Sequence, residues 1–156
     1  QYDIEHIKNA IFKRKLGIEQ NTVDYISILY RIDKWEDGYL ELKSLLDEGY
    51  NFYNIYFYLG LYYLKTNNFK VALEYFNKTI NIKNDHGAAL NNAGVLFLLN
   101  GDKKRAKEYL ELAMSYYPSY MDANNNSYLL DKENTSFEDL KFTWRELRKV
   151  LTSYSG

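Results

Sequence analysis

The residue types that most often carry catalysis are scarce and far apart in this chain of 156 residues. Its only two histidines, His6 and His86, stand eighty positions apart, and it has no cysteine. No stretch has the spacing of a zinc site, a phosphate-binding loop or a nucleophile elbow. We therefore expect no catalytic residue, no metal site and no cofactor. His86 stands at a predicted helix start, where we expect a surface or capping residue.

The charged residues favour a solvated surface. Asp33 with Asp37 and Glu108 with Glu111 have the spacing of neighbours on a helix surface, where they are expected to face water. A basic cluster at residues 103–107 opens a predicted helix, although cations are disfavoured at that end of the helix dipole. We interpret the cluster as a solubilising face, and a partner contact is the alternative.

Composition indicates one domain with ample material for a core. The chain is 46% apolar and contains 17 tyrosines, whose rings can line both a core and a binding surface. Basic and acidic residues number 20 and 21, so there is no electrostatic footprint for nucleic acid. The longest apolar run, residues 95–99, is far shorter than the roughly 20 residues of a membrane span. We expect no nucleic-acid partner and no membrane insertion.

Two further features concern the origin of the chain. The absence of cysteine fits a reducing compartment, and we expect a cytoplasmic protein. The chain begins at Gln1 rather than methionine and shows no signal-peptide pattern. We interpret it as a piece of a longer polypeptide.

Apolar residues recur at helical spacing almost throughout, and the chain has only one proline. We expect a first helix over residues 2–16, followed by antiparallel helix pairs. The predicted pairs are 20–32 with 35–48, 52–66 with 69–82, 86–99 with 102–115, and 119–130 with 136–152. Ser136 and Asp139 have the spacing of a capping box that would open the last helix.

Two stretches of the chain repeat one pattern 34 positions apart. The pattern consists of small residues at helix crossings and bulky residues between helices. The first copy has Leu59, Gly60, Tyr63, Ala72, Phe76 and Thr79, and the second has Ala93, Gly94, Phe97, Ala106, Leu110, Ala113 and Pro118. A fixed period of this size indicates a stacked array, because one helix pair cannot bury its apolar face alone.

This pattern resembles the tetratricopeptide repeat, a helix–turn–helix unit of 34 residues. Departures are Thr79 in place of an alanine and Asn84 where a proline is common. The resemblance implies an all-α, right-handed superhelical solenoid of antiparallel helix pairs, in one domain over 1–156. Its predicted parts are an N-terminal helix (2–16), a degenerate repeat (19–52), two full repeats (53–86 and 87–120) and a divergent capping helix pair (121–152).

In arrays of this family the first helix of each pair lines the concave groove. The groove positions that the resemblance implies are Asn54, Phe57, Tyr58, Leu61, Lys65, Asn91, Asn92, Val95, Leu98 and Asn126. Asn92 stands just before a small pair, as in family members whose asparagine grips the backbone of an extended peptide. The position one period after Asn92 is Asn126, and the position one period before it is Tyr58. The predicted row of peptide-binding asparagines therefore has two members. The alternative is that these asparagines are ordinary polar helix residues.

The resemblance also excludes one ligand. A subclass of the family holds a chaperone's C-terminal carboxylate with lysines, an arginine and asparagines. The corresponding positions here are Val23, Ser27, Tyr58, Ala88 and Asn92, of which only Asn92 fits.

We therefore expect a non-catalytic scaffold that binds a protein partner, as a peptide or a helix, in its concave groove. The alternative is an accessory, positioning or self-association domain of a larger enzyme, such as a bacterial glycosyltransferase or methyltransferase. The partner would then be the rest of the longer polypeptide or a second copy in a homo-oligomer.

Overall fold

The computed structural model describes residues 3–133 and 135–147, and this part of the chain contains eight α-helices and no strand. The helices are α1 (Ile4–Phe12), α2 (Ile18–Arg31), α3 (Trp35–Asp47), α4 (Tyr53–Lys65), α5 (Phe69–Ile82), α6 (Gly87–Leu99), α7 (Lys103–Tyr116) and α8 (Met121–Leu130). A single 3₁₀ turn, η1 (Phe137–Asp139), follows. None of the described helices is both long enough and apolar enough to cross a bilayer.

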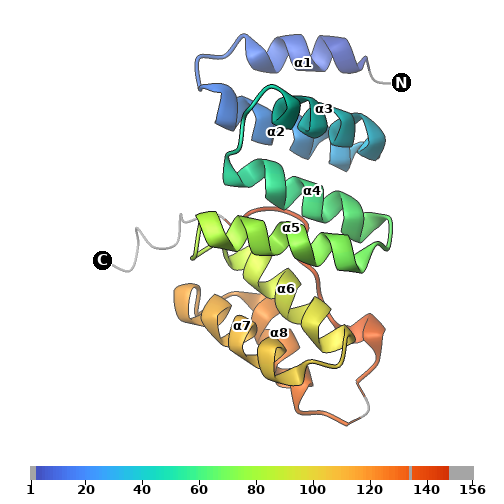
Figure 1. The fold of residues 1–156 in the computed structure, drawn as a ribbon, viewed down its shortest axis with the longest axis vertical. Helices are drawn as coiled ribbons and strands as arrows, with labels where there is room; N and C mark the ends of the chain where they lie inside the picture. The colour runs from blue at the N-terminus through green and yellow to red at the C-terminus, as the bar shows by residue number, and fades with distance from the viewer. Residues whose placement is uncertain (1–2, 134, 148–156) are drawn as a thin grey trace.

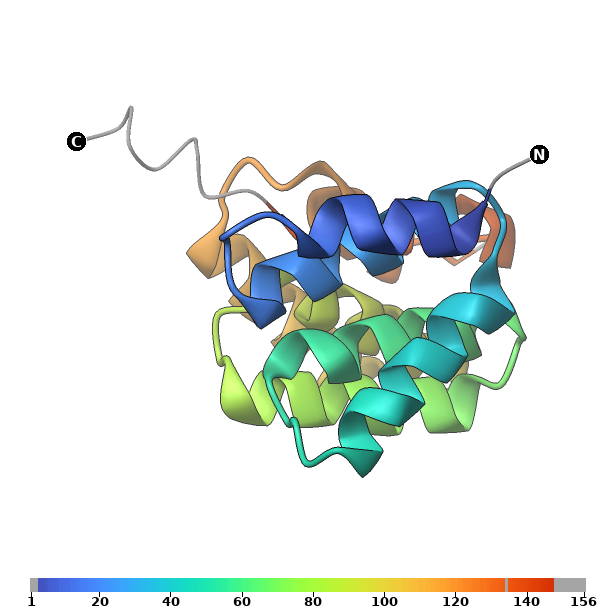
Figure 2. The ribbon, with the colours of Figure 1, turned by 90° about the horizontal axis from the view of Figure 1, so that it is seen from above.

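The helices form an all-α solenoid. They follow one another down the long axis of the molecule, from α1 at the N-terminal end to α7 and α8 at the other (Figure 1). Seen from above, along the long axis, the helices overlap one another, with α1 nearest the viewer (Figure 2). Each helix therefore packs mainly on its neighbours in sequence, as a repeat architecture requires.

Small residues one period apart let the helices of each repeat approach closely. Ala72 and Ala106 are fully buried. A Cβ atom added at Gly60 would lie 2.6 Å from the Phe76 ring, and one added at Gly94 would lie 3.0 Å from Leu110. The bulky residue of the second helix therefore fills the space that the glycine of the first helix leaves open.

The first helix is shorter than predicted. It covers Ile4–Phe12 rather than residues 2–16. The Arg14 side chain folds back to donate to the Ile11 carbonyl at 3.1 Å, and it also pairs with Asp24 at 2.6 Å. Gly17 then adopts a positive φ of 88°, so the chain turns into α2 where a longer helix would have continued.

The predicted last helix, residues 136–152, is wrong over its described part, so within the described residues the expected capping pair at 121–152 shows only its first helix, α8. The Ser136–Asp139 capping box is present, but it opens only the 3₁₀ turn. Residues 140–147 are not helical, and residues 148–152 lie outside the described part. Phe142, Thr143 and Trp144 are residue types that favour extended chain. Side chains of the preceding helices replace the backbone hydrogen bonds that a helix would have made.

Candidate peptide-binding groove

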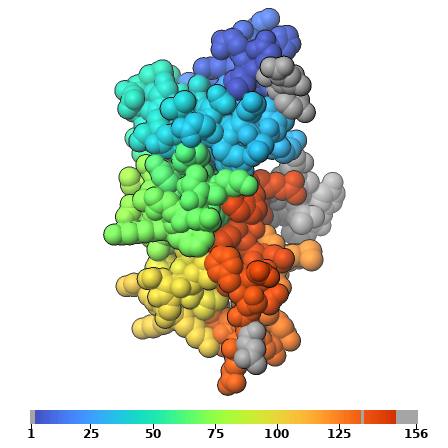
Figure 3. Space-filling model, turned by 90° about the vertical axis from the view of Figure 1, so that its right-hand side faces the viewer, coloured from blue at the N-terminus to red at the C-terminus, as the bar shows by residue number. Residues whose placement is uncertain are grey.

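Residues 137–147, called here the docked segment, lie against the first helices of the repeats. The segment contacts α8 through Asn125 and Asn126, α6 through Asn91 and Asn92, and α4 through Asn54. It therefore runs from the C-terminal end of the array back toward its middle. Figure 3 shows it, in red and orange, beside the green and yellow helices. We call the face of α4, α6 and α8 that it occupies the groove.

Two asparagines each hold both peptide groups of one residue in the docked segment. Asn126 accepts from the Lys141 N–H and donates to the Lys141 carbonyl, both at 2.8 Å. Asn92 makes the same two bonds with Thr143, at 2.7 and 2.8 Å. Asn91 adds a bond to the Lys141 carbonyl at 2.9 Å. A carboxamide can do this because it both donates and accepts. We call the Asn92 and Asn126 pairs the asparagine clamp.

The clamp matches the period of the array to the period of an extended chain. Asn92 and Asn126 are 34 residues apart, and they hold residues two positions apart, Thr143 and Lys141. Two residues of extended chain span about 6.6 Å, and alternate residues face the same way. Each helix pair therefore advances the groove by two residues of bound chain.

The clamp ends at α4, where Tyr58 occupies the position of Asn92. The Tyr58 hydroxyl pairs with Ser27 of α2 at 2.9 Å, away from the docked segment. Its side chain is buried, and burial raises its pKa well above the ordinary value, so it stays protonated. The first helix of this repeat thus offers no amide to the backbone of the segment at this position.

The Thr143 side chain enters a polar pocket between α6 and α8. Its hydroxyl donates to the Asp122 carboxylate at 2.7 Å and also contacts the Tyr120 hydroxyl. Because the single threonine proton goes to Asp122, Tyr120 is the donor to Thr143. Burial is the main cause that raises the Tyr120 pKa, which keeps this donor protonated. Thr143 is only 6% exposed, so its hydroxyl depends on these partners rather than on water.

The Glu146 carboxylate lies between α4 and the start of α6. Asn54 donates to it at 2.6 Å, and His86 contacts it through Nε2 at 3.2 Å. His86 caps α6, because its Nδ1 accepts from the Ala89 N–H at 3.1 Å. A neutral imidazole that accepts at Nδ1 carries its proton on Nε2, so His86 donates to Glu146. The positive end of the α6 dipole also favours an anion here.

The aromatic side chains of the docked segment meet aromatics that begin the second helices. The Trp144 ring lies 6.0 Å from Trp35 at 78°, and the Phe142 ring lies 6.3 Å from Phe69. Phe137 stacks on Phe69 from the other end of the segment, at 6.2 Å. Trp35 and Phe69 are one period apart, so they repeat along the groove as the asparagines do.

Beside the docked segment a cavity of about 990 Å³ remains open toward α2. Ser27, Tyr30, Trp35 and Tyr58 line its repeat side, and residues 142–147 line the other. The segment therefore fills only part of the space that the array encloses.

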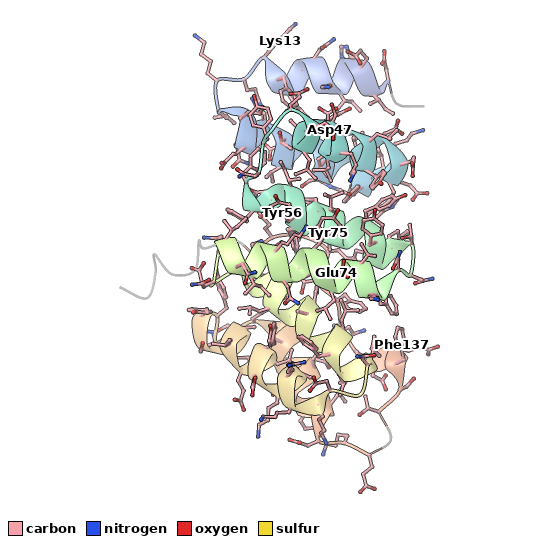
Figure 4. All side chains as sticks on the ribbon, in the orientation of Figure 1. Lys13, Asp47, Tyr56, Glu74, Tyr75 and Phe137 are labelled. Atoms are coloured by element: carbon pink, nitrogen blue, oxygen red, sulfur yellow. The ribbon has the colours of Figure 1, made fainter. Side chains whose placement is uncertain are left out.

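Much of the tyrosine content lies elsewhere. Tyr56 and Tyr75 stack at 6.3 Å, and Tyr63 stacks on Tyr75 at 5.6 Å. Figure 4 labels Tyr56 and Tyr75 on the face of α4 and α5 toward the viewer, whereas Figure 1 draws the docked segment behind these helices. Lys78 covers both rings at 5.7 and 5.2 Å. These tyrosines lie on the outer face of the array and do not line the groove.

The structure brings together four of the ten residues predicted for the groove, all of them asparagines: Asn54, Asn91, Asn92 and Asn126. Phe57, Leu61 and Val95 are fully buried, and Tyr58 pairs with Ser27. Leu98 is half-buried, and exposed Lys65 lies over the Trp35 ring at 5.6 Å. Asn92 is 0% exposed, because the chain's own docked segment covers it.

Sequence analysis missed the residues that receive side chains of the docked segment. They are Tyr120 and Asp122 at Thr143, His86 at Glu146, and Gly87, where a Cβ atom would lie 2.5 Å from Leu147. Only His86 carried a signal, its place at a predicted helix start. The roles of Tyr120, Asp122 and Gly87 follow only from the position of the docked segment in the groove.

Comparison with known proteins supports the repeat pattern. The family model described as tetratricopeptide repeat matches at residues 53–86 and again at 87–120. A search of curated protein sequences found no match.

Solved structures share the fold at low identity. A crystal structure of MamA has a TM-score of 0.68 at 16% identity, over 87% of this chain and 79% of that one. YrrB, described as a TPR protein with an unusual peptide-binding site, has a TM-score of 0.59 at 18% identity, over 78% of this chain and 64% of that one. A mutant of the Thermobaculum terrenum O-GlcNAc transferase scores 0.64 at 14% identity, over 83% of this chain but 23% of that one.

Proposed function

We propose that this chain, which contains two tandem tetratricopeptide repeats, is a non-catalytic interaction scaffold whose groove binds an extended peptide through its backbone. The asparagine clamp is the observation that supports the proposal. Asn92 and Asn126 each pair with an N–H and a carbonyl, which every residue except proline offers. The clamp therefore recognises extended chain at two alternate positions whatever side chains those positions carry.

The occupant of the groove in the free chain is its own docked segment, so a partner peptide has to take its place. A test needs a chain in which the groove is accessible. We define the opened variant as the full chain with Phe142→Ala and Trp144→Ala. These changes remove the contacts of the Phe142 ring with Phe69 and of the Trp144 ring with Trp35, and neither residue lies in a helix.

The proposal is tested by selecting peptides from a displayed random library on the opened variant. Selected peptides should lose roughly 5- to 150-fold in affinity when Asn92→Ala is added. This range corresponds to two neutral hydrogen bonds at about 0.5–1.5 kcal/mol each. Lys107→Ala, an exposed change on α7, is the matched control and should leave affinity unchanged. Selected peptides that ignore Asn92→Ala and respond to Lys107→Ala would contradict the proposal.

The second candidate function is an accessory or self-association domain of a larger enzyme. One observation favours it: the Thermobaculum terrenum transferase structure contains this fold as 23% of its chain. Self-association predicts a concentration-dependent dimer in light scattering that persists in the Asn92→Ala variant. A monomer at all concentrations would remove that form of the alternative.

A further inference from the structure

We infer that the groove selects peptides in which a threonine stands between two aromatic residues and an acidic residue follows three positions later, and that the docked segment is the chain's own copy of this ligand. The inference rests on the proposed function, because it adds side-chain selection to the backbone recognition of the clamp. The pattern in this chain is Phe142-Thr143-Trp144-Arg145-Glu146.

A polar pocket selects the residue at the threonine position, because one of its two polar groups needs a hydrogen-bond donor and the other needs an acceptor. The Asp122 carboxylate needs a donor, and the Tyr120 hydroxyl needs an acceptor, so a hydroxyl that does both completes the pocket. Valine has the shape of threonine, but it would leave the buried Tyr120 hydroxyl without its acceptor and would remove a donor from the Asp122 carboxylate. A carboxylate at this position would face Asp122 and be repelled. The pocket therefore favours a neutral hydroxyl side chain.

The acidic position is selected by two buried donors. Asn54 is 5% exposed and His86 is 4% exposed, and both direct an N–H to the same Glu146 oxygen. His86 is fixed in this role because its other nitrogen caps α6. Hydrogen bonds to an ionised acceptor are about twice as strong as those between neutral groups. A carboxylate therefore fits this site better than the isosteric amide.

The two aromatic positions face the other side of the bound chain. In an extended segment the side chains of residues 142 and 144 point opposite to that of residue 143. They reach Phe69 and Trp35, while Thr143 reaches Asp122. The spacing of two positions matches the spacing of the clamp, so a single register satisfies the backbone, the hydroxyl and both rings.

The docked segment competes with any separate peptide because it is tethered. Residues 131–136 join it to α8, a link short enough to keep the segment near the groove. Short tethers give effective concentrations on the order of millimolar. A separate peptide with the same contacts should therefore bind the parent chain weakly and the opened variant more tightly.

The test measures fluorescence anisotropy of a labelled peptide with the sequence of residues 137–147 on the full chain. The opened variant should bind it at least about tenfold more tightly than the parent chain does, because a tethered competitor has been weakened. Peptides with Thr143→Val or Glu146→Gln should bind the opened variant roughly tenfold more weakly than the natural peptide. A peptide with Lys141→Ala is the control and should match the natural one, because its side chain is exposed and only its backbone is held.

The outcomes separate this inference from the proposed function. If the Thr143→Val and Glu146→Gln peptides bind as tightly as the natural one, yet all lose binding with Asn92→Ala, the function stands and the inference is wrong. If no peptide binds a variant that keeps its helical circular dichroism, the proposed function itself fails.

Thr143→Pro in the full chain gives a second opened variant, since it removes the N–H held by Asn92. A parent chain that is dimeric, and monomeric when opened, would make a second copy the occupant and overturn the inference.

Discussion

The repeats at 53–86 and 87–120 pack alike but offer different chemistry to the groove. Gly60 and Gly94 leave space for the bulky residue of the next helix in both. The two repeats differ at one equivalent position. The Tyr58 hydroxyl pairs with the Ser27 hydroxyl at 2.9 Å, whereas Asn92 holds both peptide groups of Thr143. The two repeats therefore share their packing positions and differ at a position that meets the groove in one of them. An array of this kind can change its ligand without changing its core.

The two repeats also contribute to different parts of the bound chain. The repeat at 87–120 and α8 hold the backbone at residues 141 and 143, through the clamp. The repeat at 53–86 supplies Asn54 to a side chain, Glu146, instead. Backbone recognition and side-chain selection therefore occur at successive places along one groove.

The largest expected effect tests what the two repeats share. Ala72→Leu and Ala106→Leu should each lower the free energy of unfolding by roughly 1–3 kcal/mol, because both sites are 0% exposed and have no room for three more carbons. Urea melts followed by circular dichroism measure the change. Unfolding free energies equal to that of the parent chain would mean that these positions are not the close crossings that the period indicates.

The next effect tests what the repeats do not share. Asn92→Ala leaves the buried N–H and carbonyl of Thr143 unpaired, which should cost about 1–3 kcal/mol in docking of the segment. Hydrogen exchange at residues 141–147 should become faster, while exchange in α4 and α5 should be unchanged.

Tyr58→Phe is the matched change at the equivalent position. It removes only the hydroxyl that pairs with Ser27, so it should cost about 1 kcal/mol of global stability and leave exchange in the docked segment unchanged. Faster exchange at residues 141–147 in Tyr58→Phe, but not in Asn92→Ala, would reverse the assignment of the two positions.

These contrasts explain what could be predicted from sequence. The step of 34 residues predicted residues 52–66 and 86–99 as helices, and the structure has Tyr53–Lys65 and Gly87–Leu99. The same step placed Asn92 and Asn126 in register, and both hold the docked segment. Local pattern and period suffice here because each repeat packs on its neighbour in a fixed way.

The docked segment could not be predicted in the same way. Apolar residues at helical spacing and the Ser136–Asp139 capping box predicted a last helix that the described residues do not form. The competing interaction is long-range, since the amides that hold Lys141 and Thr143 lie on α6 and α8. A sequence pattern reports local preference, and tertiary contacts of this kind override it. Asp122 and Tyr120 were missed for the same reason.

A further comparison is between the two glycines that lie one period apart. Gly60→Ala should cost about 1–2 kcal/mol, because its Cβ would lie 2.6 Å from the buried ring of Phe76. Gly94→Ala should change stability by less than about 1 kcal/mol, because its nearest contact, Leu110, lies farther away at 3.0 Å, and alanine favours the helix by about 1 kcal/mol. Thermal melts of both variants measure the difference, and a Gly94→Ala variant less stable than Gly60→Ala would contradict it.

The smallest expected effect is on the outer face of α7, where Lys107 and Glu111 lie 4.0 Å apart and are 62% and 57% exposed. Exposed pairs one helical turn apart contribute only a few tenths of a kcal/mol, because water screens them and their side chains lose entropy when held. Lys107→Ala and Glu111→Ala should therefore change both stability and peptide affinity by less than about 0.5 kcal/mol. Urea melts and calorimetry with a selected peptide measure the two quantities. If either change weakens binding more than Asn92→Ala does, the outer face rather than the groove carries the interaction, and the contrast between Tyr58 and Asn92 has no bearing on binding.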